Sequence, residues 1–120
     1  MNNQIVRFTV SLTIHEGKFE AFQATAKELM AGSRKEPGTL GYEWYLSADR
    51  KRCRVLETYA DESAMLAHLS GPVVQSLVPK LLELVSVDGF EVYGTPGAKG
   101  TEMLGGWGAP MFAFWDGIKK

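Results

Sequence analysis

Two runs of alternating apolar and polar residues, followed by a short helical segment, occupy residues 36–69 and constrain the fold more than any other part of the chain. The residues sharing one face of each run are Leu40, Tyr42, Trp44 and Leu46, then Cys53, Val55, Glu57 and Tyr59. A period of two residues is typical of strands. The polar residues 48–51 between the runs suit a hairpin loop, so the stretch predicts a β-hairpin.

A short helix is predicted directly after the hairpin. Asp61 is a residue type that caps helix N-termini, and Glu62 places negative charge near the positive end of the helix dipole. An apolar side follows at Met65, Leu66 and Leu69. Gly71-Pro72 ends this helix, and Pro72 suits the first position of another. The segment carries one histidine, His68.

The rest of the chain completes an α+β pattern. Residues 4–14 alternate as a strand, and the period changes at Lys18 to a helical stripe that ends before Pro37. Residues 73–87 have helical spacing, with Pro79 as a kink or restart, and Asp88-Gly89 predicts a turn into a last strand at 90–93. The order β-α-β-β-α-β predicts a ferredoxin-like unit, in which helices lie on one face of a four-stranded antiparallel sheet.

The other face of the sheet carries bulky residues as well. Trp44 and Tyr45 are neighbours on one strand and so point to opposite faces of the sheet, and the same holds for Val55 and Leu56 on the next strand. A sheet that is apolar on both faces needs a cover on both. A second copy of the same sheet would provide that cover, which predicts a two-fold homodimer.

Residues 95–120 differ from the unit predicted for residues 1–94. They contain many glycines and show no regular period. They are also rich in large apolar residues, which is unusual for a disordered segment. We expect an arm that docks on its own subunit or on the dimer partner, with a floppy tail as the alternative.

Composition excludes several classes of function. Thirteen basic and fourteen acidic residues give a net charge of -1, which argues against nucleic acid as a partner. Cys53 is the one cysteine, so no intrachain disulfide can form. No stretch has the pattern of a signal peptide or a membrane span, which predicts no membrane partner and a cytoplasmic location.

The stretch around the hairpin resembles the antibiotic biosynthesis monooxygenase (ABM) family. The matching features are Glu36-Pro37-Gly38, Tyr42, Glu57-x-Tyr59, and Ala64-x-x-x-His68-Leu69 before Ser70-Gly71-Pro72. With its flanking strand and helix, the resemblance extends from residue 4 to about residue 93. It implies a dimeric α+β barrel, and for some members the oxidation of quinol-like or polyketide aromatic substrates by molecular oxygen without metal, flavin or haem.

A haem-degrading branch shares this fold and is disfavoured. Its members carry a tryptophan at the position of His68, and their iron-binding histidine would fall near Val78. Valine cannot ligate iron. The spacing of the two histidines and the cysteine indicates no metal site, and no glycine-rich loop lies between a strand and a helix. We therefore expect no cofactor.

His68 is the candidate catalytic residue. A histidine can accept a proton from a phenol or hydroquinone at neutral pH, and the resulting anion is electron-rich enough to reduce oxygen. The alternative is a surface or capping histidine with no chemical role. The leading hypothesis is a cofactor-independent monooxygenase acting on a small phenolic or quinol-like molecule. The alternative is a dimeric barrel that binds or senses an aromatic ligand without turnover.

Six further residues are candidates for substrate binding. Phe8, Tyr42 and Trp44 would form an aromatic wall, with plain core packing as the alternative. Glu57 is a charge within a strand, which implies a partner. That partner is predicted to be Arg7 in a structural ion pair; otherwise Glu57 orients His68 or a substrate hydroxyl. Tyr59 would donate a hydrogen bond to a carbonyl or pack beneath the short helix.

Overall fold

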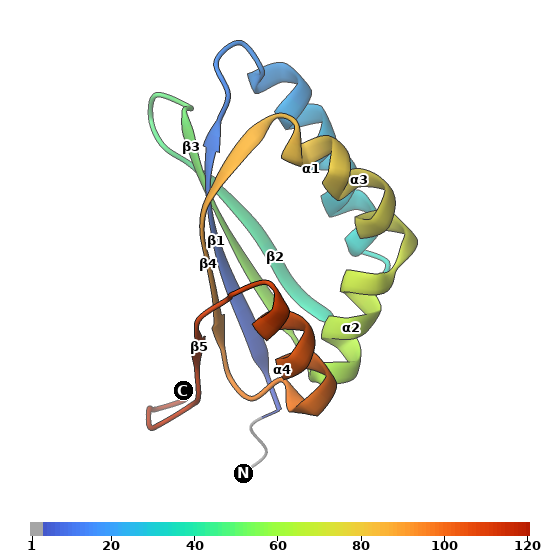
Figure 1. Cartoon of the computed structure of the whole chain (residues 1–120), viewed down its shortest axis with the longest axis vertical. Helices are drawn as coiled ribbons and strands as arrows, with labels where there is room; N and C mark the ends of the chain where they lie inside the picture. The colour runs from blue at the N-terminus through green and yellow to red at the C-terminus, as the bar shows by residue number, and fades with distance from the viewer. Residues whose placement is uncertain (1–3) are drawn as a thin grey trace.

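The computed structural model describes residues 4–120 and confirms the predicted α+β, ferredoxin-like order. The elements in chain order are β1 (Val6–Ile14), α1 (Phe19–Ser33), β2 (Thr39–Leu46), β3 (Arg52–Tyr59), α2 (Glu62–Ser70), α3 (Pro72–Leu82), β4 (Val85–Tyr93), α4 (Gly97–Gly106) and β5 (Met111–Phe112). They form two layers, with α1, α3 and α2 on one face of the sheet and α4 beside α2 (Figure 1).

The sheet has the strand order β2-β3-β1-β4-β5, with β1 at its centre. Neighbouring strands are antiparallel except β4 and β5, which run parallel. Alternate side chains of β1 point toward the helices and are buried, as in Val6, Phe8 and Leu12. The alternation seen in the sequence therefore determines which face of each strand meets the helix layer.

The interior has two hydrophobic clusters side by side on the helix-facing side of the sheet. One joins the sheet to α1 and α3 and includes Leu12 and Leu29. The other joins the sheet to α2 and α4 and includes Phe8 and Met65. Val10 of the central strand packs against both clusters, and a cavity lies where they meet, which positions the candidate site.

The fourth strand is longer than predicted, and the preceding helix is shorter. Helix α3 ends at Leu82, and β4 already begins at Val85, so the prediction of helix through residue 87 is wrong. The predicted turn at Asp88-Gly89 is wrong, because both residues lie within β4. Ser11 of β1 pairs with Gly89 and Leu12 pairs with Val87, so Asp88 is an extra residue in β4. A β-bulge there keeps the strand continuous while absorbing the extra residue.

The loop before β2 packs closely on α2. A side chain at Gly38 would place its Cβ atom 2.4 Å from the Cβ of Ala64, so only glycine allows this approach. Asp61 caps α2 as predicted, with its carboxylate accepting a hydrogen bond from the backbone N–H of Ala64 at 2.9 Å. The loop and the first turn of α2 are thereby held together.

The segment after β4 contains the helix α4 and the short strand β5, although its sequence shows no regular period. The first turn of α4 is tied to α2 because the Glu62 carboxylate accepts a hydrogen bond from the backbone N–H of Gly100 at 2.9 Å. Leu104 is fully buried in the second cluster. The helix therefore docks on its own chain. Residues 113–120 continue without helix or strand, and Trp115 there is 92 % exposed.

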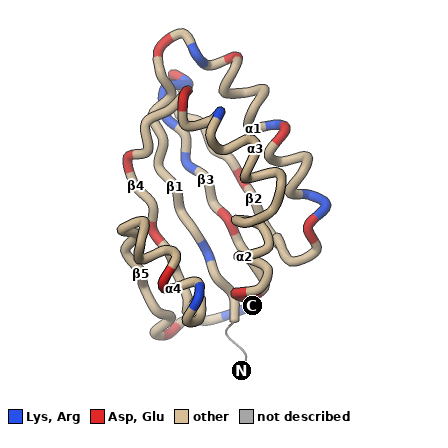
Figure 2. Tube along the Cα trace, turned by 45° about the vertical axis from the view of Figure 1, so that its right-hand side comes forward, with Lys and Arg blue, Asp and Glu red and all other residues tan. Residues whose placement is uncertain are grey.

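The sheet face away from the helices is mostly polar but keeps several large apolar side chains. Tyr45 and Leu56 are exposed there, and Phe112 of β5 stacks on Tyr93. Basic and acidic residues are interspersed along the chain rather than gathered by sign (Figure 2). Within residues 4–120, no helix has the length and hydropathy needed to cross a membrane.

Candidate functional site

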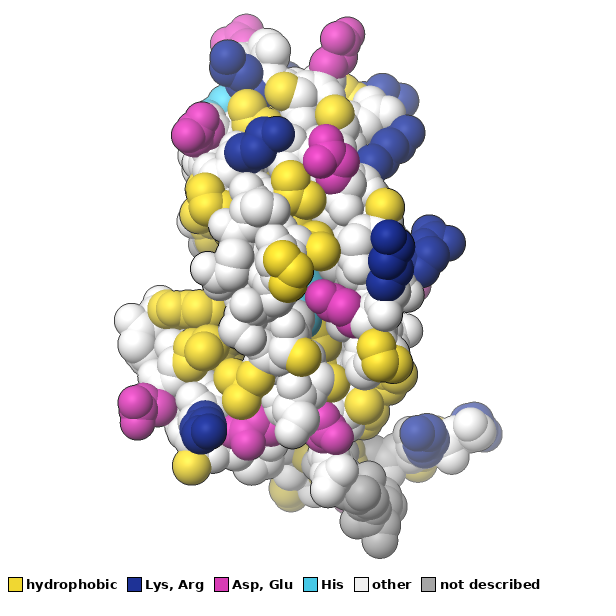
Figure 3. Space-filling view, turned by 90° about the vertical axis from the view of Figure 1, so that its right-hand side faces the viewer, with side chains coloured by type: hydrophobic (Ala, Val, Ile, Leu, Met, Phe, Trp, Pro, Cys, Tyr) yellow, Lys and Arg dark blue, Asp and Glu magenta, His cyan; other side chains and the backbone are white. Residues whose placement is uncertain are grey.

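A cavity of about 170 Å³ lies between the sheet and helices α2 and α3, at the junction of the two hydrophobic clusters. Its wall is largely aliphatic and aromatic, with side chains such as Val10, Val74 and Leu81. Glu57 and His68 are the acid and the imidazole in this apolar wall. Figure 3 looks onto the helix layer and shows hydrophobic side chains scattered among charges of both signs.

His68 is buried at the inner side of α2, where 2 % of its surface is exposed. It lies one turn after Met65, so both side chains point from the helix toward the sheet. The ring packs against Tyr42 and Tyr59, with centroid distances of 5.2 Å to each. The alternative of a surface histidine is therefore wrong.

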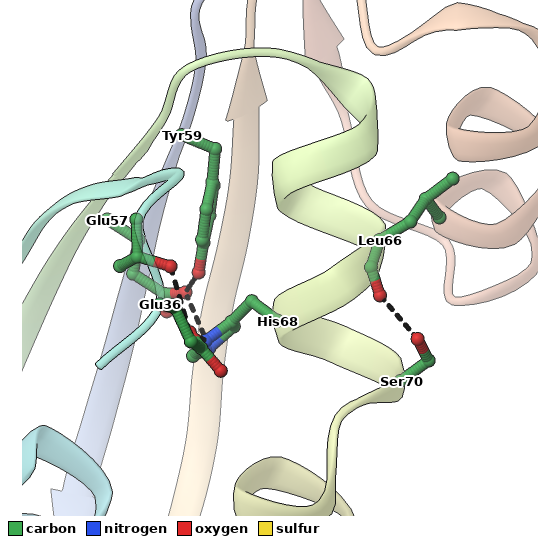
Figure 4. Close-up of polar contacts among 7 residues, drawn as sticks. Glu36, Glu57, Tyr59, Leu66, His68 and Ser70 are labelled. Carbon is green, nitrogen blue, oxygen red and sulfur yellow. Dashed lines mark hydrogen bonds and ion pairs between the residues drawn. The ribbon is translucent and has the colours of Figure 1, made fainter. Parts of the chain in front are cut away.

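A carboxylate that the sequence reasoning missed holds the His68 ring. Glu36 Oε1 lies 2.8 Å from His68 Nδ1 and also accepts a hydrogen bond from the Thr39 hydroxyl at 2.9 Å (Figure 4). Because an ionised carboxylate can only accept, we assign the proton to Nδ1. Nε2 is then left with a lone pair. Glu36 was noted only within the Glu36-Pro37-Gly38 resemblance, and the close approach at Gly38 is what brings it to α2.

Glu57 projects from β3 into the same site. Its Oε1 atom accepts a hydrogen bond from the Tyr59 hydroxyl and lies 3.8 Å from His68 Nε2 (Figure 4). Burial raises the pKa of the Glu57 carboxyl, while the Tyr59 hydrogen bond and, when His68 is protonated, the charge of its ring act in the opposite direction. The carboxyl therefore holds its proton to higher pH than an exposed glutamate.

The predicted ion pair between Arg7 and Glu57 does not form. Arg7 pairs with Thr58 in the β1–β3 register, whereas Glu57 lies opposite Phe8. Neighbouring residues on a strand point to opposite faces. Arg7 is accordingly exposed on the outer face of the sheet, remote from the cavity. Its predicted contact with substrate is therefore wrong.

The predicted aromatic residues Phe8, Tyr42 and Trp44 all line the cavity. Burial raises the pKa of the Tyr42 hydroxyl, so this group stays a neutral hydrogen-bond donor. The indole Nε1 of Trp44 is buried without a hydrogen-bond partner among the described residues. Such an unpaired donor is costly unless a bound molecule accepts from it.

Tyr59 does not line the cavity. Tyr59 is fully buried behind Glu57. Its hydroxyl donates a hydrogen bond to the Glu57 carboxyl, and its ring packs under α2. Two aromatic residues that the sequence reasoning did not select extend the wall instead. Phe90 of β4 contacts Trp107, which follows α4, edge to face at 6.0 Å between centroids, and both line the cavity. No periodicity pointed to Trp107, because its position depends on how α4 docks.

No group of three or more histidine, cysteine, aspartate or glutamate side chains within residues 4–120 is arranged to hold a metal ion. Val78, at the position discussed for an iron ligand, is part of the apolar wall. The arrangement is instead a buried carboxyl with a raised pKa beside an oriented imidazole at an apolar space. Such a pair can accept and donate protons.

Residues 5–80 match the profile of the family described as antibiotic biosynthesis monooxygenase. The chain belongs to the ABM family. The match includes Glu36, Glu57 and His68 but ends before α4. No curated protein matches the chain in sequence.

Several solved structures share the fold. MupZ from Pseudomonas fluorescens is 22 % identical with a TM-score of 0.85, over 98 % of this chain and 96 % of MupZ. SnoaB, a cofactor-independent oxygenase from Streptomyces nogalater, is 17 % identical with a TM-score of 0.68, over 79 % of this chain and 96 % of SnoaB. A conserved protein from Bacteroides thetaiotaomicron, described as a possible oxidoreductase, is 27 % identical with a TM-score of 0.69, over 76 % of this chain and 97 % of that protein. The likeness to MupZ thus includes nearly the whole arm.

Proposed function

We propose that this ABM-family protein is a cofactor-independent monooxygenase that uses molecular oxygen to oxidise a small phenolic or quinol-like molecule. The observation that carries the proposal is the buried His68 imidazole, held at Nδ1 by Glu36 and lining an aromatic cavity. The family membership and the likeness to SnoaB support the reaction class.

The base in this proposal is His68 Nε2. It takes the hydroxyl proton of the bound quinol or phenol, and the Glu36 carboxylate stabilises the imidazolium that forms. The deprotonated ring is electron-rich and reduces oxygen. When a ring C–H of the quinol becomes C–OH and the ring is oxidised to the quinone, one oxygen atom enters the substrate and the other leaves as water. The substrate supplies all the electrons, so no external reductant is needed.

Substrate binding in this proposal relies on the aromatic wall. Phe8, Tyr42 and Trp44 offer ring faces and edges to a planar molecule. Glu57 would orient a substrate oxygen, and Tyr59 acts only through Glu57. An apolar cavity also excludes water from the anion that must react with oxygen.

The test is oxygen uptake with menadiol, with the autoxidation of menadiol subtracted. We expect His68→Ala to lower the protein-dependent rate about 100-fold, which is the lower range for loss of a general base. His15→Ala is the matched control, since His15 is an exposed turn residue that contacts Ser86. Equal rates for wild type and His68→Ala would refute the assigned role. Tight menadiol binding without oxygen uptake would favour a binding or sensing protein instead.

We also propose that the protein acts in the cytoplasm as a homodimer. The free Cys53 is consistent with a reducing compartment. The apolar side chains on the outer sheet face, Tyr45, Leu56 and Phe112, would be buried by a second copy of that face. Sedimentation of the full chain tests the dimer, and Leu56→Lys would shift a dimer of this geometry toward monomer. A monomeric wild-type chain would refute it.

A further inference from the structure

The proposed oxidation uses a base but leaves the proton of Glu57 without a role. This carboxyl lies in an apolar wall, and the basic side chain beside it within residues 4–120 is His68, whose neutral Nε2 lies 3.8 Å from Oε1. No lysine or arginine of the described chain pairs with it. A buried carboxyl without a cationic partner favours its neutral form.

The position of the Glu57 proton follows from its hydrogen bonds. The Tyr59 hydroxyl donates to Oε1, so in the neutral carboxyl Oε1 is the acceptor and the proton is on Oε2. The Glu57 side chain keeps about 10 % of its surface exposed and lines the cavity. Glu57 Oε1 lies 3.8 Å from His68 Nε2, and the acid and the imidazole both line the same apolar cavity.

We propose that this cavity also catalyses a reaction that needs no oxygen, the keto–enol tautomerisation of a small bicyclic aromatic ketone. His68 Nε2 takes a proton from the carbon next to the carbonyl, and Glu57 donates a hydrogen bond and then its proton to the carbonyl oxygen. A carboxylic acid kept neutral by an apolar site stabilises an enolate oxygen in this way.

The step is balanced without any co-reactant. The C–H bond breaks, its electron pair forms the C=C bond, and the carbonyl π pair moves to the oxygen, which takes the Glu57 proton. Glu57 is then a carboxylate and His68 an imidazolium. Passing one proton from Nε2 to Glu57 restores both groups. The reaction uses the same cavity, His68 and Glu57 as the proposed oxidation, but it needs no oxygen and does not depend on the oxidation taking place.

The cavity determines the class of ketone. Its volume of about 170 Å³ is close to that of an engineered cavity of roughly 150 Å³ that binds benzene. It therefore encloses one ring. Trp107, 56 % exposed, lies at its edge beside Phe90 and would contact a second ring. A two-ring ketone with one carbonyl matches one enclosed ring, one acid and one base.

The test is hydrogen–deuterium exchange into 2-tetralone in oxygen-free deuterated buffer, followed by loss of the proton NMR signals next to the carbonyl. We expect the full-length protein to accelerate exchange above the buffer rate. His68→Ala should lower the protein-dependent rate about 100-fold and Glu57→Gln at least about tenfold, because the amide cannot deliver a proton. Circular dichroism confirms that each variant is folded.

Glu91→Gln is the matched control. Glu91 also accepts a hydrogen bond from a tyrosine two residues later, Tyr93, but on the outer face of the sheet. The Glu91→Gln variant should catalyse deuterium exchange into 2-tetralone at the wild-type rate. Wild-type protein that gives no exchange above buffer overturns the proposal without recourse to any variant, and equal rates for Glu57→Gln and wild type overturn the role of the acid. Exchange without oxygen uptake from menadiol would refute the oxidation and leave the tautomerisation standing; the reverse result would do the opposite.

Discussion

Glu36 Oε1 and His68 Nδ1 lie 2.8 Å apart, although 32 residues separate them in the chain. The contact joins the loop before β2 to the inner side of α2. It fixes the ring orientation and leaves Nε2 as the nitrogen that can accept a proton. The electrostatics of the site thus depend on a loop residue that does not itself line the cavity.

Glu36→Gln should slow any reaction that uses Nε2 as a base by about 10- to 100-fold, which is the cost of losing the orienting partner of a metal-bound histidine. The amide of glutamine can donate to Nδ1, which favours the tautomer with the proton on Nε2. Nitrogen NMR of the labelled imidazole would detect this change of tautomer, in which the proton moves from Nδ1 to Nε2. Unchanged nitrogen shifts, with or without a slower reaction, would contradict the assigned tautomer.

Glu43→Gln is a suitable control for this change, because Glu43 is exposed on β2. It should leave the rate and the imidazole nitrogen shifts as they are in the wild type.

Gly38→Ala should destabilise the protein by about 1–3 kcal/mol, the usual cost of overpacking. The new Cβ atom would stand 2.4 Å from that of Ala64, and the loop would have to move away, taking Glu36 with it. Urea unfolding measures the loss. Adding Ala64→Gly should recover part of it, whereas Gly106→Ala, with no neighbour within 4 Å, should cost little. Additive effects of Gly38→Ala and Ala64→Gly would refute the contact.

The sequence predicted the strands and the inner face of the sheet well, because period-two patterns report burial directly. It failed at residues 83–87, where apolar residues suit a helix and a strand equally. Of the candidates chosen by residue type and resemblance, His68, Glu57, Tyr42 and Trp44 line the cavity. The sequence did not point to Glu36 and Trp107, since both reach the site through contacts between elements distant in the chain. Arg7 cannot pair with Glu57 because the two side chains point to opposite faces of the sheet.

The raised pKa of Glu57 makes stability depend on pH. In the unfolded chain the carboxyl loses its proton near its ordinary pKa of 4.5, but burial delays this loss in the folded protein. Above pH 4.5 the folded state therefore binds more protons, and the free energy of unfolding falls as pH rises toward the folded pKa. The loss is about 1.4 kcal/mol for each tenfold difference in proton affinity.

Glu57→Gln should remove this dependence. The variant and the wild type should be similarly stable below pH 4.5, and the variant more stable at pH 8. Thermal unfolding across this range measures both. A wild type that gains stability relative to Glu57→Gln as pH rises would show that the carboxyl is ionised in the folded state.

Glu62→Ala should loosen the docking of α4. The carboxylate accepts from the backbone N–H of Gly100, and loss of such a cap costs about 1 kcal/mol. Amide exchange in residues 97–106 should therefore become roughly fivefold faster. Glu102→Ala alters an exposed residue of the same helix and should leave exchange nearly unchanged. Equal acceleration in both variants would mean that charge, not the cap, holds the helix.

Trp107→Ala should weaken the binding of two-ring ligands more than that of one-ring ligands. The indole lies at the edge of the cavity against Phe90, so a single enclosed ring does not reach it, whereas a second ring would stack on it. Loss of one aromatic contact is worth about 0.5–1.5 kcal/mol, which corresponds to a roughly two- to twelvefold rise in Kd for naphthol and little change for phenol. Fluorescence or calorimetric titration measures both constants. Trp115→Ala is the control, because that indole is 92 % exposed in the terminal segment. If Trp107→Ala and Trp115→Ala raise the Kd for naphthol equally, the arm does not form part of the binding site.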